Sequence, residues 1–253
     1  MRLQKLPLLI FFLLFGAMPL CSQVVNVESS RMQSDTVGWM GTAGTNFNFI
    51  KNVEKITLIN LNAHVQYKSK KDLWLLIGYY GFLKGGNEKF VGNSFGHVRY
   101  NRKLNSWLRW EIFNQIQSNS ITQIDFRYLA GTGPRFKIAD TKVFHFYIAA
   151  LFMYEHEKEK TAPPVIHNDI RNSSYVSFTI VPNPYIEIIS TTFYQPLLKN
   201  FKDYRLLNES LLKARTGKHF ALTVAYNYLN DRFPAGNAPG TTYQLMMGLQ
   251  YDF

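Results

Sequence analysis

The sequence contains a single cysteine among 253 residues, and only 18% of its residues are charged. After the extreme N-terminus it has no apolar run of the length that a membrane helix requires, about 20 residues. One cysteine cannot form an internal disulfide, and the lack of apolar runs excludes a protein with several membrane helices. Aromatic residues are abundant at 15%, so a disordered or coiled-coil chain is excluded as well.

The N-terminus has the features of a secretory signal peptide. Arg2 and Lys5 precede an apolar stretch over residues 6–14, and small residues follow before the expected cleavage point. We therefore predict a signal peptide over residues 1–22 and an N-terminal periplasmic segment over residues 23–37.

Two alternatives to a cleaved signal are an anchoring helix, which Gly16 and Pro19 would interrupt, and a lipoprotein attached through Cys21. Cleavage after residue 22 removes two basic and no acidic residues, so the formal net charge falls from +11 to +9. Export makes anionic lipids or anionic solutes the expected partners of this basic chain, and no nucleic acid is expected.

Alternation of apolar and polar residues recurs along the rest of the chain. In segment 55–67, Ile59 and Leu61 share one parity, while Asn60 and Asn62 have the other. A period of two places these sets on opposite faces of a β-strand. Turn signals divide the chain into twelve such segments, which we predict as strands over residues 38–50, 55–67, 72–84, 90–102, 106–118, 121–138, 141–156, 170–181, 184–197, 203–214, 218–230 and 241–253.

The predicted fold is all-β, a closed antiparallel transmembrane β-barrel of about 12 strands that occupies residues 38–253 as one domain. A sheet can enter a bilayer only if it closes, because backbone groups in lipid must pair internally. The connections are short at one end and mostly longer at the other, which is typical of outer-membrane barrels. A soluble β-barrel that binds a hydrophobic ligand has the same alternation, but side chains fill an interior of this width poorly. We therefore expect a location in the cell outer membrane.

The polar parity carries many charged residues, which would line the interior. They can pair with one another and stiffen or plug the barrel, or they can line a narrow aqueous path for small solutes with a weak anion preference. The predicted charge ladder comprises Arg99, Arg109, Glu111, Asp125, Arg127, Arg135, Glu187, Arg205 and Glu209, with Lys137 and Lys213 on the same parity.

Two further features fit a barrel. Gly131 and Gly133 have the inward parity, where missing side chains leave room for long neighbours or for a bend. The chain ends in a phenylalanine preceded by alternating apolar residues, which is typical of the signal that the barrel-insertion machinery reads. We predict this signal at Tyr243, Leu245, Met247, Leu249, Tyr251 and Phe253.

Several segments together resemble the bacterial family called domain of unknown function 481, a group of salt-induced outer-membrane-protein-like chains. The resemblance covers about residues 38–253 and implies an outer-membrane barrel, but it implies no reaction. Its segments are SFGHVRYNRKL (94–104), RWEIFNQIQSN (109–119), FRYLAGTGPRFKI (126–138), residues 194–212 and GLQYDF (248–253).

Signs of catalysis are weak. His64, His97 and His145 have the inward parity, whereas a lipid-acting outer-membrane enzyme would present its histidine to the lipid. The acidic and histidine residues of segments 155–160 and 167–169 could bind a metal, but this pattern is typical of a solvated loop.

We therefore expect no enzyme, no cofactor and no metal. The expected partners are outer-membrane lipids, the insertion machinery and possible small solutes. The predicted role is envelope-structural or that of a narrow passive solute channel. The alternatives are a lipid-acting outer-membrane enzyme and an exported soluble β-barrel.

Overall fold

The computed structural model describes residues 37–51, 55–85, 88–120, 122–217 and 220–251. These residues form twelve β-strands, and none of them is helical. The twelve predicted strands are confirmed, with ends that differ by a few residues. They are β1 (Gly38–Lys51), β2 (Lys55–Lys68), β3 (Asp72–Gly85), β4 (Glu88–Lys103), β5 (Leu108–Asn119), β6 (Ile124–Asp140), β7 (Phe144–Glu159), β8 (Ile166–Asn183), β9 (Ile186–Leu197), β10 (Asn200–Arg215), β11 (Phe220–Asp231) and β12 (Thr241–Tyr251).

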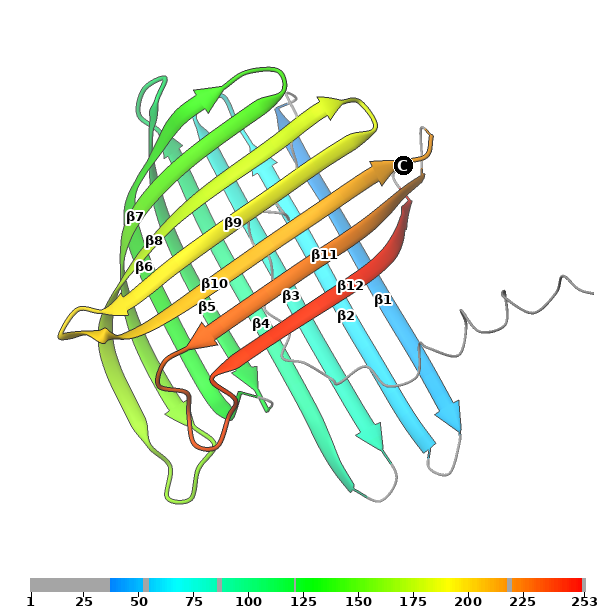
Figure 1. Cartoon of the computed structure of the whole chain (residues 1–253), viewed down its shortest axis with the longest axis vertical. Helices are drawn as coiled ribbons and strands as arrows, with labels where there is room; N and C mark the ends of the chain where they lie inside the picture. The colour runs from blue at the N-terminus through cyan, green and yellow to red at the C-terminus, as the bar shows by residue number, and fades with distance from the viewer. Residues whose placement is uncertain (1–36, 52–54, 86–87, 121, 218–219, 252–253) are drawn as a thin grey trace, which may run out of the picture.

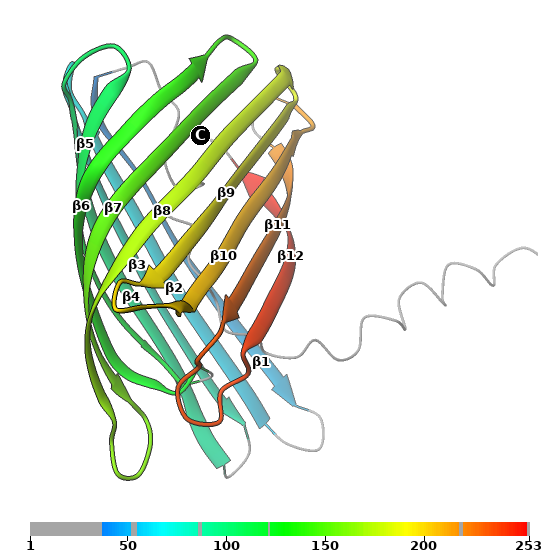
Figure 2. The ribbon, with the colours of Figure 1, turned by 60° about the vertical axis from the view of Figure 1, so that its left-hand side comes forward.

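The strands form one antiparallel meander. Each strand pairs with its neighbours in the chain, in the order β1 to β12. Figures 1 and 2 show the strands tilted and wound about a common axis, so that the sheet is strongly curved. The described residues form no ladder between β1 and β12, so closure of the sheet stays a prediction. Among these residues, no helix is long and apolar enough to cross a membrane.

Short polar side chains make the tight turns at one end of the sheet, which we call the turn end. The Ser69 hydroxyl accepts a hydrogen bond from the backbone N–H of Asp72 at 2.9 Å, between β2 and β3. Asn105 Oδ1 accepts the backbone N–H of Leu108 at 2.8 Å, between β4 and β5. Asn183 does the same at the start of β9. Such side chains stabilise turns because they replace backbone partners.

The opposite end, which we call the loop end, carries the connections 120–123, 160–165, 198–199 and 232–240. Here the β7–β8 hairpin extends further than the sequence predicts. Its ladder continues to the pair Lys158 and Ile166, so β8 begins four residues before the predicted position 170. Residues that were predicted to form a loop are strand residues instead, and they pair with the end of β7 across the hairpin. His167 and Asp169 have the inward parity there, and Ile166, Asn168 and Ile170 have the outward parity.

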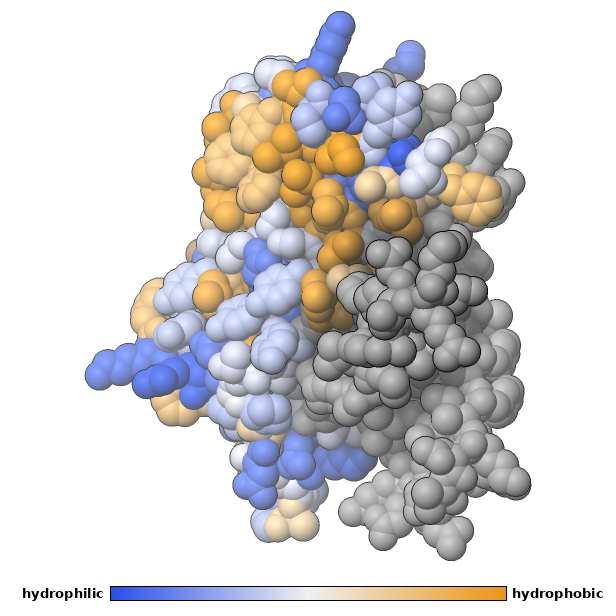
Figure 3. Space-filling model, turned by 45° about the vertical axis from the view of Figure 1, so that its right-hand side comes forward, coloured by the Kyte–Doolittle hydropathy of each residue, from blue (hydrophilic) through white to orange (hydrophobic). Residues whose placement is uncertain are grey.

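The convex face of the sheet is apolar. Along β7 the side chains alternate between exposed and buried, and the large exposed ones are apolar, as at Phe152, which is 62% exposed. Figure 3 shows hydrophobic residues gathered on the outer surface beneath a hydrophilic upper rim. The exposed apolar side chains include Trp74, Leu76, Val98, Ile112, Ile116, Phe152, Ile170, Val176, Leu212, Leu222 and Leu245.

Candidate functional site on the concave face

Most residues of the predicted charge ladder face the concave side of the sheet. Arg109 stands over the ring of Tyr147, with 5.5 Å from its Cζ to the ring centroid. Glu187 pairs with Arg215 at 3.4 Å. Arg109, Arg127 and Glu187 are partly buried. The fully buried members are Arg99, Glu111, Arg135, Arg205 and Glu209.

The charges near the loop end form a cluster around Glu155, which is 1% exposed. One of its oxygens lies 3.0 Å from Nε of Arg127 and 2.5 Å from Nη1 of Arg205. The other oxygen accepts a hydrogen bond from Nε of Arg171 at 2.6 Å. Three guanidinium groups from β6, β8 and β10 thus converge on one carboxylate of β7. The Glu155 cluster comprises Arg127, Glu155, Glu157, Arg171, Asp203, Arg205 and Asp231.

Further carboxylates occupy the outer sides of the same guanidinium groups. Arg205 Nε donates to Asp231 at 2.8 Å, and Arg171 Nη1 donates to Asp203 at 2.9 Å. Glu157 accepts hydrogen bonds from both Arg127 and Arg205. The cluster therefore holds three guanidinium groups against four carboxylates, one more negative than positive charge. Its arginines are engaged by fixed carboxylates, which leaves the cluster little attraction for a free anion.

A second cluster lies nearer the turn end, around Glu111, which is 0% exposed. Its carboxylate lies 3.2 Å from Nη1 of Arg135 and 3.6 Å from Nη1 of Arg99. The hydroxyl of Tyr175 donates to it at 2.7 Å, from three strands away. Arg135 also stands over the ring of Tyr147 at 4.2 Å, a cation–π contact. Curvature of the sheet brings these groups of β4, β5, β6 and β8 together.

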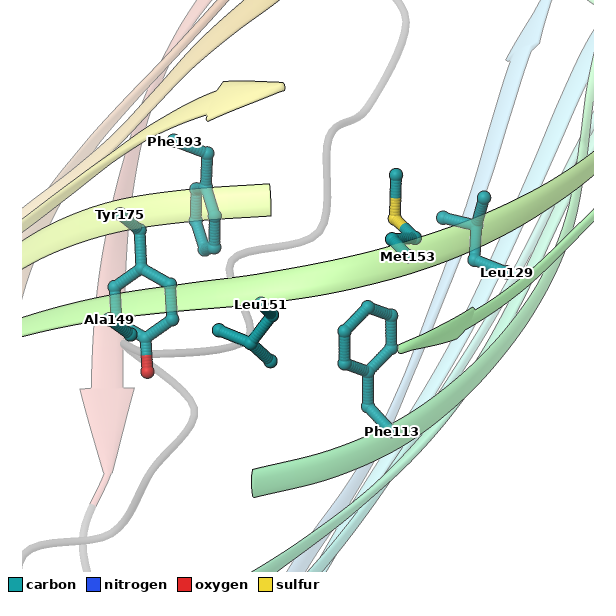
Figure 4. Packing of buried hydrophobic residues seen from close by; sticks show 7 residues of the cluster. All are labelled: Phe113, Leu129, Ala149, Leu151, Met153, Tyr175 and Phe193. Atoms are coloured by element: carbon teal, nitrogen blue, oxygen red, sulfur yellow. The ribbon is translucent and has the colours of Figure 1, made fainter. Parts of the chain in front are cut away.

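An apolar belt packs against these charges on the concave face of β5 to β9. Figure 4 shows Leu151 between Phe113 on one side and Tyr175 and Phe193 on the other. Each of its side chains is at most 8% exposed. Such surroundings lower the local polarity, so the ion pairs beside them are stronger and harder to separate. The belt comprises Phe113, Leu129, Ala149, Leu151, Met153, Tyr175 and Phe193.

The prediction for Asp125 is wrong. Its side chain is 45% exposed and pairs with Nζ of Lys158 at 2.6 Å on the outside of the sheet. A β-bulge between Ile124 and Phe126 shifts the register with β7 and inverts the parity at the start of β6. Its neighbour Ile124 faces the interior and is 3% exposed. A simple period of two cannot foresee this because one extra residue exchanges the faces.

Sequence reasoning missed the centre of the Glu155 cluster. Glu155 and Glu157 were assigned to a solvated loop tip, and Arg171 was not placed in the ladder. Glu155 and Arg171 lie inside the predicted strands 141–156 and 170–181, so the parity rule applied to those strands would have found them. Only Glu157 required a longer strand, since the ladder of β7 continues to Lys158. The belt was missed because its residues interrupt the polar parity with apolar side chains.

The predicted inward histidines lie in different surroundings. His97 is 1% exposed, and it contacts Gln115 Oε1 at 3.0 Å and receives a hydrogen bond from Arg99 Nε at 3.3 Å. His145 lies near the turn end and contacts Asp140 at 2.6 Å. His64 is partly buried. The described residues include no group of three or more His, Cys, Asp or Glu side chains that could hold a metal ion.

Part of the predicted C-terminal signal is visible. Tyr243, Leu245 and Met247 are 66%, 49% and 69% exposed and share the outer face of β12. The side chains of Leu249 and Tyr251, and Phe253 as a whole, lie outside the described residues. So do the predicted signal peptide and all but the last residue of the segment 23–37.

The interior contains a partly open cavity of about 140 Å³ on the loop side of the Glu111 cluster. Its wall includes side chains of β3 to β11 and the loop 232–240. This loop extends beyond the ends of β11 and β12 (Figures 1 and 2), and its Gly236 N–H donates to Glu159 Oε2 of β7 at 3.1 Å. The other oxygen of Glu159 lies 2.7 Å from Nε2 of His167. The loop therefore forms a roof over the cavity.

Comparison with known proteins gives four findings. A family model described as "Protein of unknown function, DUF481" matches residues 54–253. No curated protein matches the chain. The solved structure of the NanC porin is similar, with 11% identity, a TM-score of 0.52, and coverage of 85% of this chain and 98% of that chain. The β-domain of the Bordetella autotransporter BrkA gives 12% identity, a TM-score of 0.37 and the same coverage. The porin similarity shows the fold alone.

Proposed function

The chain belongs to the DUF481 family, and on this premise we propose that it is an integral outer-membrane β-barrel, closed by pairing of β1 with β12. The proposal assigns it a structural role in the envelope or a narrow passive path for small solutes, and it includes no catalysed reaction. Similarity of fold to an outer-membrane porin supports this environment.

One observation carries the proposal: the distribution of polarity is the inverse of that in a soluble protein, with apolar side chains exposed and charged side chains buried. Side chains such as Phe152 and Met247 are more than 60% exposed, while Glu111 and Glu155 are at most 1% exposed. In water this arrangement would expose a large apolar surface and bury ions, both of which are unfavourable. In a bilayer the same apolar face contacts acyl chains, and the polar groups are enclosed.

Strand length and edge chemistry support the same environment. The strands have 11 to 18 residues, and a tilted membrane strand needs about 9–11. An unpaired strand edge in lipid would leave backbone N–H and C=O groups without partners. Pairing of β1 with β12 removes both edges at once, which is why the proposal includes closure.

Cell fractionation tests this function. Envelopes separated by density should contain the protein in the outer-membrane fraction, and the extracted protein should migrate faster on a gel before boiling than after it. Folded membrane barrels resist the detergent of the gel until they are heated. Recovery in the soluble periplasmic fraction, with no effect of boiling, would contradict the proposal.

Planar-bilayer recording tests how the interior is used. We expect small currents, because two charged clusters and the apolar belt fill much of the concave face. A large, steady current in the unmodified protein would contradict a narrow path. Closure is tested separately by disulfide formation between cysteines placed on β1 and β12.

A further inference from the structure

We propose that the interior cavity is a binding site for an uncharged aromatic alcohol with one ring, a phenol. The inference concerns the inside of the sheet and goes beyond the proposed membrane role. It depends on the size of the cavity, the polarity of its two walls and the charge balance around it.

The size of the cavity sets the size of the ligand. The cavity measures about 140 Å³, and an apolar cavity of about 150 Å³ in another protein binds benzene. A single six-membered ring therefore fits within it. Leu129, Met153, Phe193, Leu207 and Leu229 supply an apolar wall from β6, β7, β9, β10 and β11.

The facing wall comes from β4, β5 and the connection 120–123, and it carries amides and hydroxyls beside the rings of Phe95 and Phe113. It includes Asn93, Gln115, Gln117, Asn119 and Thr122. The Oδ1 atom of Asn93 and the Oγ1 atom of Thr122 are buried and have no hydrogen-bond partner among the described residues. An amide oxygen accepts and a hydroxyl both donates and accepts, so a ligand hydroxyl would satisfy either atom. Buried polar atoms normally have partners, so this wall is where a ligand's polar group belongs.

The existing ion pairs disfavour an anion. Three arginines line the cavity, and each is already paired: Arg99 with Glu111, and Arg127 and Arg205 with Glu155. An entering carboxylate would compete with these carboxylates for the guanidinium groups and would be repelled by Glu209 and Asp231, which also line the cavity. A sugar is also disfavoured, because its hydroxyls on every side would lose hydrogen bonds against the apolar wall. A ring with one hydroxyl matches both walls.

The roof lies over the loop side of the cavity. Ala235 and Ala238 of the loop 232–240 are at most 9% exposed and line the cavity. Gly236 has a φ of +51°, and a Cβ there would lie 2.7 Å from Gln123 Oε1 and 2.9 Å from Thr161 Cγ2. The loop thus packs closely on the neighbouring loop-end connections and covers this side of the cavity.

Calorimetric titration of the full-length protein in detergent tests the inference, with p-cresol as the probe. We expect saturable binding at least about tenfold tighter than that of p-toluate, the anion with the same ring, and of glucose. Partition into micelles is not saturable and is measured in protein-free detergent. Each sample is first checked for heat-dependent gel mobility, so failure to bind is separated from failure to fold.

Two variants of β10 distinguish the cavity from the outer surface. Leu207→Trp fills the apolar wall and should weaken p-cresol binding at least about tenfold. Leu212→Trp makes the same change on the exposed face and should leave binding unchanged. No saturable binding to a folded protein would overturn the inference. Preference for p-toluate or glucose, or equal binding by the two variants, would overturn it as well.

Discussion

At the scale of single residues, Glu155 shows how the interior tolerates charge. A buried carboxylate alone would be strongly unfavourable, yet here guanidinium groups of three other strands reach it within 3.0 Å. Four strands are thereby tied together at one point. Such a network adds little to the free energy of unfolding relative to well-packed apolar residues in the same place. The loss of one member, however, leaves the others buried without a partner.

We therefore expect Glu155→Gln to lower the free energy of unfolding by about 3–5 kcal/mol, because three buried guanidinium groups lose their shared charge. Urea unfolding in lipid vesicles, followed by gel mobility, measures the change. Asp125→Asn is the control, since Asp125 pairs with Lys158 at the surface, and little change is expected there. Equal stability of the two variants would show that the cluster is not a structural tie.

Gly133 marks a close approach of two strands. A Cβ at this position would lie 2.2 Å from the carbonyl oxygen of Ala150 and 2.7 Å from Cα of Leu151, both backbone atoms of β7. The prediction that this glycine leaves room for neighbours agrees with this geometry, although the neighbour is backbone and not a long side chain.

Gly133→Ala should destabilise the fold by about 1–3 kcal/mol, because backbone cannot move aside as a flexible side chain can. The matched control is Gly78→Ala in β3, where nothing lies within 4 Å of the added Cβ. Thermal unfolding of both variants measures the difference. If Gly78→Ala destabilised the fold more than Gly133→Ala, the close approach of β7 to Gly133 would not be what excludes a side chain there.

At the scale of elements, each strand presents one face to each environment. β8 exposes Ile170 and Val176 and buries Arg171, Ser173 and Tyr175 between them. The strand is therefore amphipathic with a period of two, and its outer face is the more apolar one. A soluble strand with a buried apolar face has the opposite orientation.

This orientation predicts how lysine is tolerated along the outer face. Val176→Lys, near the middle of β8, should lower the free energy of unfolding in lipid by about 2–4 kcal/mol. Ile138→Lys, near the end of β6, should lower it by about 0–1 kcal/mol. Folding yield in vesicles, read from heat-dependent gel mobility, measures the effect. In a water-exposed sheet both lysines would be harmless, so equal yields would contradict the membrane assignment.

At the scale of the whole molecule, curvature decides which residues meet. Tyr175 and Glu111 are 64 residues apart in the chain, and Arg205 and Glu155 are 50 apart. These pairs join strands that are not hydrogen-bonded neighbours. The sheet is therefore curved so strongly that distant parts of its polar face come into contact.

Closure of the sheet predicts contact between the first and last strands. One cysteine placed at Ala43 of β1, combined with single cysteines along β12, should form a disulfide at one register, since bonded cysteines need Cα atoms about 4.4–6.8 Å apart. Cys21 is the only native cysteine and lies in the predicted signal peptide, so the introduced pair would be alone in the mature chain. Gel mobility under non-reducing conditions detects the bond. Absence of a bond at every register would contradict closure.

The sequence by itself determined the number of strands, their order and which face of most strands is apolar. It could do so because these properties depend on a local period of two and on turn residues such as Asn105 and Asn183. It also identified most of the buried charges, since charged residues on the polar parity have only one face to occupy.

The tertiary structure alone decided the partners of those charges, the bulge that turns Asp125 outward, and the apolar belt with its cavity. Each of these depends on curvature and register between distant strands. A local pattern carries no information about them, because the same alternation fits a flat sheet, a narrow barrel or a wide one.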